Sequence, residues 1–170
     1  DYGLKILKEV GIGLNSTQLL LDMKTNDEGA YEFERGFETQ ADILTVMGSS
    51  SLDTLKAVYE VTEKTGKSML IDLLGLSDEQ INGILGFENA IYGLHHSKDD
   101  NSGFDAIQTT ADFHNHFPAV QHIAVAGGID MEQAAGLAKQ QIAETIIVGG
   151  KIVKTADPVA AAKQFMKEIH

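Results

Sequence analysis

The stretch TQLLLDMK, residues 17 to 24, is a short apolar run that ends in charged side chains. A run that is apolar on both faces is typical of a strand buried within a parallel sheet. Further runs of this kind follow at intervals of roughly 25 residues, the spacing of a minimal βα unit. They are ILTVMG (43–48), SMLIDLLG (68–75), AIYGLHH (90–96), HIAVAGG (122–128) and TIIVGG (145–150).

Helical patterns lie between these predicted strands. Ser51 and Ser77 stand where N-caps are expected, and Gly66 stands where a helix should end. The alternation therefore predicts repeated βα units and a parallel sheet. The expected helices cover residues 1–10, 31–40, 51–66, 77–86, 104–117, 131–141 and 158–170.

The fold class predicted from this order is α/β, as a (β/α)₈ TIM barrel that lacks its first two strands in this chain. A closed barrel needs eight βα units, and the sequence displays six after a leading helix. The chain opens at Asp1 without a methionine, so we expect a single barrel domain over residues 1–170 that is incomplete at its N-terminus. An open flavodoxin-like or Rossmann-like sheet is the alternative, but its usual glycine-rich phosphate loop does not follow the first strand.

Composition excludes several classes of function. The chain has 170 residues, of which 43% are hydrophobic and 22% charged, and no apolar run is long enough for a bilayer. A formal net charge of −12 disfavours sequence-independent binding to nucleic acid or to anionic membranes. The absence of cysteine excludes disulfides, thiolate metal sites and a thiol nucleophile, and it is compatible with a cytoplasmic protein.

Charged residues gather where the predicted strands end. Asp22 and Lys24 are two apart, so on a strand they face the same side, and Asp27 lies in the loop just beyond. This trio offers a metal ligand and proton carriers, with a structural salt bridge as the alternative. Asp72 interrupts an apolar strand, where a carboxylate must be hydrogen-bonded or face the site. A capped structural aspartate is the alternative for Asp72.

The later strands end in other functional groups. His95 is a candidate general acid or base, and Lys98 is a candidate anion ligand. Glycine pairs end the last two strands, where barrels commonly bind phosphate through backbone N–H groups. Simple tight turns are the alternative for these pairs, which are Gly127 with Gly128 and Gly149 with Gly150.

With these residues in place, the sequence resembles the orotidine 5′-monophosphate decarboxylase superfamily, in its branch of 3-hexulose-6-phosphate synthases and 3-keto-L-gulonate-6-phosphate decarboxylases. DMKTNDEG (22–29) is similar to the family's D-x-K-x-x-D signature on the third barrel strand. The blocks ADILTVMG, LIDLLG, AVAGGI, IVGGKI and ADPVAAAKQF follow in the family's order and spacing. This ordered series covers nearly the whole chain.

The resemblance implies a role for each of these residues. Asp22 would bind Mg²⁺, Lys24 would contact the reacting oxygens, and Asp27 would reach across a homodimer interface to the partner's active site. His95 would move a proton to or from the intermediate, and Lys98 falls where the decarboxylases usually have arginine. Asp72 would belong to the catalytic set, and the four glycines would bind the phosphate of a pentulose or hexulose. Family members also carry an aspartate and a glutamate on two earlier strands, which this chain does not show.

Two activities and one silent role remain open at this point. Asp72, Thr25 and Gly150 resemble the synthases, which condense formaldehyde with ribulose 5-phosphate. HHSKDD (95–100) is closer to the decarboxylase pattern, and those enzymes pass through the same kind of enediolate. A non-catalytic sugar-phosphate-binding barrel is the third possibility.

Overall fold

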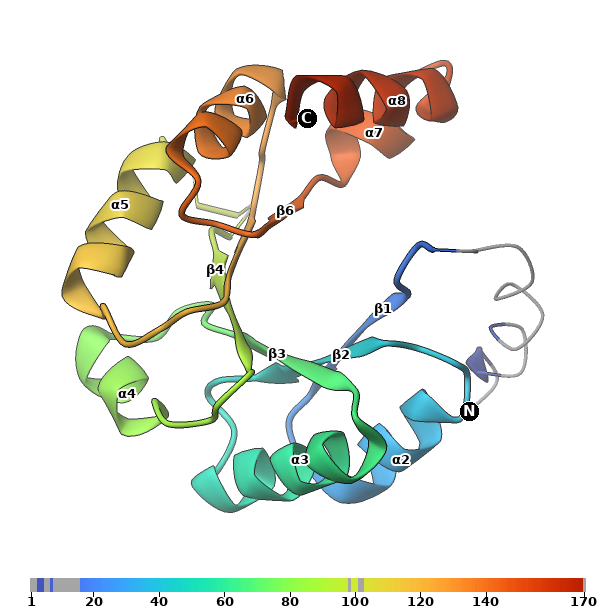
Figure 1. The fold of residues 1–170 in the computed structure, drawn as a ribbon, viewed down its shortest axis with the longest axis vertical. Coiled ribbons are helices and arrows are strands. Elements are labelled where there is room, and N and C mark those ends of the chain that lie inside the picture. The colour runs from blue at the N-terminus through green and yellow to red at the C-terminus, as the bar shows by residue number, and fades with distance from the viewer. Residues whose placement is uncertain (1–2, 5–6, 8–15, 98, 101–102, 170) are drawn as a thin grey trace. The chain divides into compact units, whose positions relative to one another are not determined.

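A computed structural model describes residues 3–4, 7, 16–97, 99–100 and 103–169 (Figure 1). The expected leading helix at 1–10 falls largely outside the described residues. The chain divides into two compact units, Asp1–Ile91 and Tyr92–His170. Among the described residues, no helix is both long enough and apolar enough to cross a membrane.

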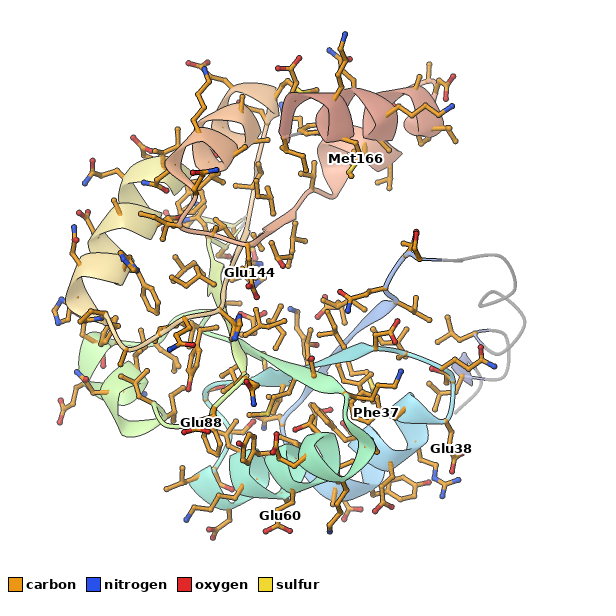
Figure 2. All side chains as sticks on the ribbon, in the orientation of Figure 1. Phe37, Glu38, Glu60, Glu88, Glu144 and Met166 are labelled. Atoms are coloured by element: carbon orange, nitrogen blue, oxygen red, sulfur yellow. The ribbon has the colours of Figure 1, made fainter. Side chains whose placement is uncertain are left out.

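The first unit contains three parallel strands in sequence order. Helices α2 and α3 lie side by side against these strands in Figure 1. Their inner faces bury Phe33, Leu55 and Val58 completely, whereas Glu60 on α3 points away from the strands (Figure 2). The elements are β1 (Leu20–Thr25), α2 (Gly29–Phe37), β2 (Ile43–Met47), α3 (Leu52–Thr65), β3 (Ser68–Asp72) and α4 (Asp78–Gly83).

The helix ends of this unit follow the local sequence. Ser51 caps α3 by accepting a hydrogen bond from the backbone N–H of Thr54, and Gly66 ends that helix in the left-handed conformation. Ser77 and Gln80 form a reciprocal capping box at the start of α4. These caps confirm the start and stop signals expected from the sequence.

The second unit repeats the βα pattern, again with parallel strands. The helices of this unit include α5 and α6, which pack together, and α8, which packs on both α6 and α7 (Figure 1). The short helix α7 was not among the helices expected from the sequence. The elements are β4 (Ile91–His95), α5 (Ala106–His116), β5 (Ile123–Ala126), α6 (Met131–Gln140), β6 (Thr145–Ile147), α7 (Gly150–Val153) and α8 (Pro158–Ile169).

The expectation that every strand is buried on both faces is wrong for β6. Its three residues are half-buried or exposed, and Ile147 keeps 37% of its surface. The physical reason is its edge position, since β5 is the only described strand that pairs with it. By contrast, the β5 residues Ile123, Ala124 and Val125 are fully buried.

Candidate active site

Three charged side chains meet at the carboxyl ends of β1 and β3. The Lys24 ammonium donates a hydrogen bond of 2.7 Å to Asp72 Oδ2 and lies 3.1 Å from Asp22 Oδ1. The Asp72 side chain is only 5% exposed, while those of Lys24 and Asp22 are 38% and 58% exposed. The cluster therefore runs from a buried carboxylate, through a half-buried ammonium, to a carboxylate open to solvent. It unites three of the residues that the sequence singled out.

Asp72 is held from a second direction by its own loop. Its Oδ1 accepts a hydrogen bond of 3.0 Å from the backbone N–H of Leu74. Buried carboxylates persist in proteins when they are paired and hydrogen-bonded, and Asp72 meets both conditions. The capped aspartate and the site aspartate, offered as alternatives, thus coexist in one residue.

The ionisation of Lys24 follows from these contacts. Burial by itself lowers the pKa of an ammonium group, but the hydrogen bonds to Asp72 and Asp22 and the charges of both carboxylates outweigh it. The net effect raises the pKa of Lys24 above its ordinary value of 10.5. Lys24 is therefore a fixed cation at neutral pH and suits the stabilisation of negative charge on a bound molecule.

The backbone under this cluster departs from a regular strand. Leu21 pairs with Leu44 and Thr25 pairs with Val46, so β1 advances four positions while β2 advances two. Lys24 itself has φ of 49°, in the left-handed region that a lysine rarely adopts. The expectation of plain strand alternation at Asp22 and Lys24 is therefore wrong, although the two side chains do meet. A bulge of this kind re-aims side chains near active sites.

Thr45 lies opposite this bulge and was not among the residues singled out from the sequence. Its hydroxyl accepts a hydrogen bond of 2.8 Å from the Lys24 backbone N–H and donates one of 3.0 Å to Asp22 Oδ1. Thr45 is 3% exposed. A polar residue inside the apolar run ILTVM was the available signal, of the same kind that drew attention to Asp72.

Asp27 lies beyond the cluster, on the exposed turn before α2. Its Oδ1 accepts a hydrogen bond of 2.8 Å from the Glu28 backbone N–H. The turn is anchored from below, because Ser50 donates hydrogen bonds of 3.3 Å to the Thr25 carbonyl and to Asn26 Oδ1. The role of Asp27 in a partner's active site stays a prediction.

The second unit places its candidate residues at the ends of neighbouring strands. His95 ends β4 and pairs in register with Ala126, the last residue of β5. Gly127 and Gly128 follow with φ of 109° and 68°, and a methyl group on Gly127 would overlap the His96 carbonyl oxygen. The tight-turn explanation therefore accounts for Gly127 and Gly128 without a ligand.

The second glycine pair has a different character. Gly149 precedes α7 and Gly150 begins it, both without a positive φ. A Cβ on Gly149 would meet no atom within 4 Å, and one on Gly150 would meet only the Lys154 side chain at 3.8 Å. Neither packing nor backbone conformation requires glycine at these two positions. Lys98, the candidate anion ligand, lies outside the described residues.

A divalent cation fits this donor set only as a partly protein-bound ion. The described residues hold no group of three or more histidine, aspartate or glutamate side chains that could bind a metal. Mg²⁺ is often held by one or two carboxylates, with water and substrate oxygens completing its shell. Asp22, exposed beside a lysine, suits that kind of ligation.

Comparison with known proteins assigns the chain to a family. Residues 1–165 match the family described as "Orotidine 5'-phosphate decarboxylase / HUMPS family". The chain belongs to this family. The sequence is 30% identical to the 3-hexulose-6-phosphate synthase of Methylomonas aminofaciens over 168 residues, which is 95% of this chain and 78% of that protein. The resemblance inferred from the sequence blocks is thereby confirmed.

Solved structures of this family share the fold. The 3-hexulose-6-phosphate synthase from Salmonella typhimurium superposes with a TM-score of 0.87 at 23% identity, over 98% of this chain and 80% of that one. The KGPDC from Streptococcus mutans, solved in complex with a sugar phosphate, gives a TM-score of 0.81 at 21% identity, over 98% and 79%. These likenesses confirm the predicted α/β barrel class.

Proposed function

We propose that this member of the family is a 3-hexulose-6-phosphate synthase, which condenses formaldehyde with ribulose 5-phosphate. The observation that carries the proposal is the Lys24 ammonium held between Asp22 and the buried Asp72. This arrangement supplies a cation for developing oxyanions and a carboxylate open to solvent. The relative from Methylomonas aminofaciens, which bears the synthase name, supports the choice of branch.

The reaction requires charge control at two adjacent oxygens of the sugar. Removal of the C1 proton of ribulose 5-phosphate gives an enediolate, whose C1 then forms a bond to the carbon of formaldehyde. The formaldehyde oxygen takes up a proton and becomes the new hydroxyl group. Lys24 would stabilise negative charge on the enediolate oxygens, and His95 would transfer protons around the new hydroxymethyl group.

Mg²⁺ is part of the proposal, with Asp22 as its ligand from the described residues. When bound, the ion would polarise the ketone and hydroxyl oxygens of the sugar. Asp72 would keep Lys24 charged and oriented, since its carboxylate holds the ammonium at 2.7 Å. A homodimer in which Asp27 completes the partner's site is also proposed here.

The phosphate group would bind at the second glycine pair. Gly149 and Gly150 have no packing or conformational need for glycine, so the close approach of a ligand to their backbone N–H groups is a physical reason for them. Gly127 and Gly128 would add N–H groups, although their conformation already requires glycine.

The decarboxylase activity is a second candidate, favoured by the segment HHSKDD. Loss of CO₂ from 3-keto-L-gulonate 6-phosphate generates an enediolate of the same kind, which His95 or water would protonate. The structural likeness to a KGPDC, at 21% identity, supports only the shared fold.

One assay separates these candidates. The protein, expressed from its complete coding sequence, is supplied with Mg²⁺ and with either formaldehyde plus ribulose 5-phosphate or 3-keto-L-gulonate 6-phosphate. Formaldehyde consumption is expected, and Lys24→Met should reduce its kcat by about 100-fold or more because a charge-stabilising donor is lost. Lys67→Met is the matched control, since Lys67 pairs with Asp42 away from the cluster.

The possible outcomes decide among the proposals. CO₂ release alone would replace the synthase with the decarboxylase. Turnover of neither substrate, together with binding of ribulose 5-phosphate, would indicate a non-catalytic sugar-phosphate-binding barrel. Equal activity of Lys24→Met and Lys67→Met would remove the catalytic role of the cluster.

A further inference from the structure

Thr45 joins two members of the charged cluster through one hydroxyl group. It accepts from the Lys24 backbone N–H at 2.8 Å and donates to Asp22 Oδ1 at 3.0 Å. A hydroxyl has one donor and two acceptor sites, so it can serve both bonds at once. A side chain with only a donor or only an acceptor could not.

The position of these bonds coincides with the irregular backbone of β1. The bulge falls between Leu21 and Thr25, and Lys24 adopts a φ of 49° within it. A left-handed conformation costs a non-glycine residue free energy and persists only where its surroundings hold it. Thr45 provides that hold, because it binds the peptide N–H of the strained residue itself.

Water cannot take over this function. Thr45 is 3% exposed, in the middle of β2, with Leu70 of β3 as its partner in register. Without its hydroxyl, the Lys24 N–H would lose its acceptor, and Asp22 would lose one of the two contacts that hold it beside the Lys24 ammonium. A buried donor that loses its acceptor is costly, so the bulge would relax toward another conformation.

We propose that Thr45 is a positioning residue, whose hydroxyl fixes the bulge that aims Asp22 and the Lys24 ammonium at the bound sugar phosphate. The proposal rests on the proposed lyase function for its catalytic consequence. Thr45 acts through Asp22 and Lys24 and makes no substrate contact of its own. Small displacements of catalytic groups lower turnover more than substrate affinity, because the groups act most strongly on the transition state.

The test compares Thr45→Val, Thr45→Ser and Thr62→Val. Valine keeps the shape and removes the hydroxyl, whereas serine keeps the hydroxyl. Thr62 is the matched control, because it is also 3% exposed but donates to the Tyr59 carbonyl within α3. Thr45→Val should lower kcat on the order of 10- to 100-fold with KM changed less than about threefold. Thr45→Ser and Thr62→Val should stay within about threefold of wild type in both constants.

A second measurement is independent of turnover. Hydrogen exchange of the Lys24 amide, followed by ¹⁵N NMR, should be clearly faster in Thr45→Val and unchanged in Thr45→Ser and Thr62→Val. If wild type proves inactive, the proposed function fails while this measurement still decides whether the hydroxyl holds the bulge. If Thr45→Val does not fold, Thr45→Ala takes its place with the same expectations.

Some results would overturn the proposal. Unchanged exchange at Lys24 in the variants without a hydroxyl would show that Thr45 does not hold the bulge. Faster exchange with undiminished kcat would show that the bulge does not matter for turnover. A Thr45→Ser variant as impaired as Thr45→Val would assign the effect to the methyl group.

Discussion

Replacement of Lys24 by methionine tests whether the buried Asp72 depends on its ammonium partner. The Asp72 side chain is 5% exposed and would keep its bond from the Leu74 N–H, but it would lose the charged donor at 2.7 Å. Breaking a fully buried ion pair costs about 3–5 kcal/mol. Lys24 is 38% exposed, so water can partly replace it, and we expect Lys24→Met to lower the free energy of unfolding by about 2–3 kcal/mol.

Lys67→Met is the matched control for this stability measurement. Lys67 lies 2.8 Å from Asp42, almost as close as Lys24 lies to Asp72, but the Asp42 side chain is 34% exposed. Asp42 also keeps a bond from the Leu19 N–H. A half-exposed carboxylate is resolvated when its partner leaves, so the loss should be under about 1 kcal/mol.

Urea unfolding at neutral pH measures these differences. The chain contains no tryptophan, so far-UV circular dichroism is the suitable signal. Adding Asp72→Asn to Lys24→Met should recover part of the loss, because no unpaired charge is then buried. Equal losses in the two lysine variants, or no recovery in the double variant, would refute the argument that burial of Asp72 sets the cost.

The same pair of proteins predicts a pH dependence. The pKa of Lys24 is raised in the folded protein by Asp72 and Asp22, against the opposing effect of burial. A group whose pKa rises on folding stabilises the protein fully below its unfolded pKa, and that stabilisation disappears as the pH rises through the folded pKa. The stability gap between wild type and Lys24→Met should therefore be constant below about pH 10.5 and narrow above it. A gap that widens in alkali would contradict this sign.

Three further predictions concern other parts of the chain. Gly127→Ala should destabilise the protein by about 3 kcal/mol or more, because φ is 109° and the methyl group would overlap the His96 carbonyl. Gly128→Ala, with open space, should cost about 1 kcal/mol in the same thermal unfolding assay. The Lys67 and Leu19 hydrogen bonds lower the pKa of Asp42, so the stability difference from Asp42→Asn should exist above about pH 3.8 and close below it in urea titrations. EDTA should abolish turnover, Mg²⁺ should restore it, and Asp22→Asn should raise the half-saturating Mg²⁺ concentration by about tenfold or more.

The strands and helices could be predicted because their signals are local. Apolar runs set the positions of the six strands, and cap residues such as Ser51 and Gly66 set helix ends. The contact between Lys24 and Asp72 was not specified by local sequence, since 48 positions separate them. Burial reasoning on Asp72 alone nevertheless required a hydrogen-bonding partner or a place in the site, and the structure provides both.

The exposure of β6 and the conformation of Lys24 could not be predicted for different reasons. Ile146 and Ile147 have the composition of a buried strand, and only the position of β6 at the edge of the described strands leaves them accessible. For Lys24, strand propensity favours an extended backbone, and the sequence contains no glycine there to announce a positive φ. The left-handed conformation arises from contacts with β2 and β3, which local sequence does not reveal.

The strain at Lys24 is tolerable because the cluster offsets it. A left-handed non-glycine residue costs about 1–2 kcal/mol. The conformation allows two hydrogen bonds, from the backbone N–H to Thr45 and from the ammonium to Asp72. The second of these is charged on both sides, and such bonds contribute about 1.5–3 kcal/mol. The backbone distortion and the ion pair therefore stabilise each other, so variants that remove either the hydroxyl or the buried carboxylate should relax the same bulge.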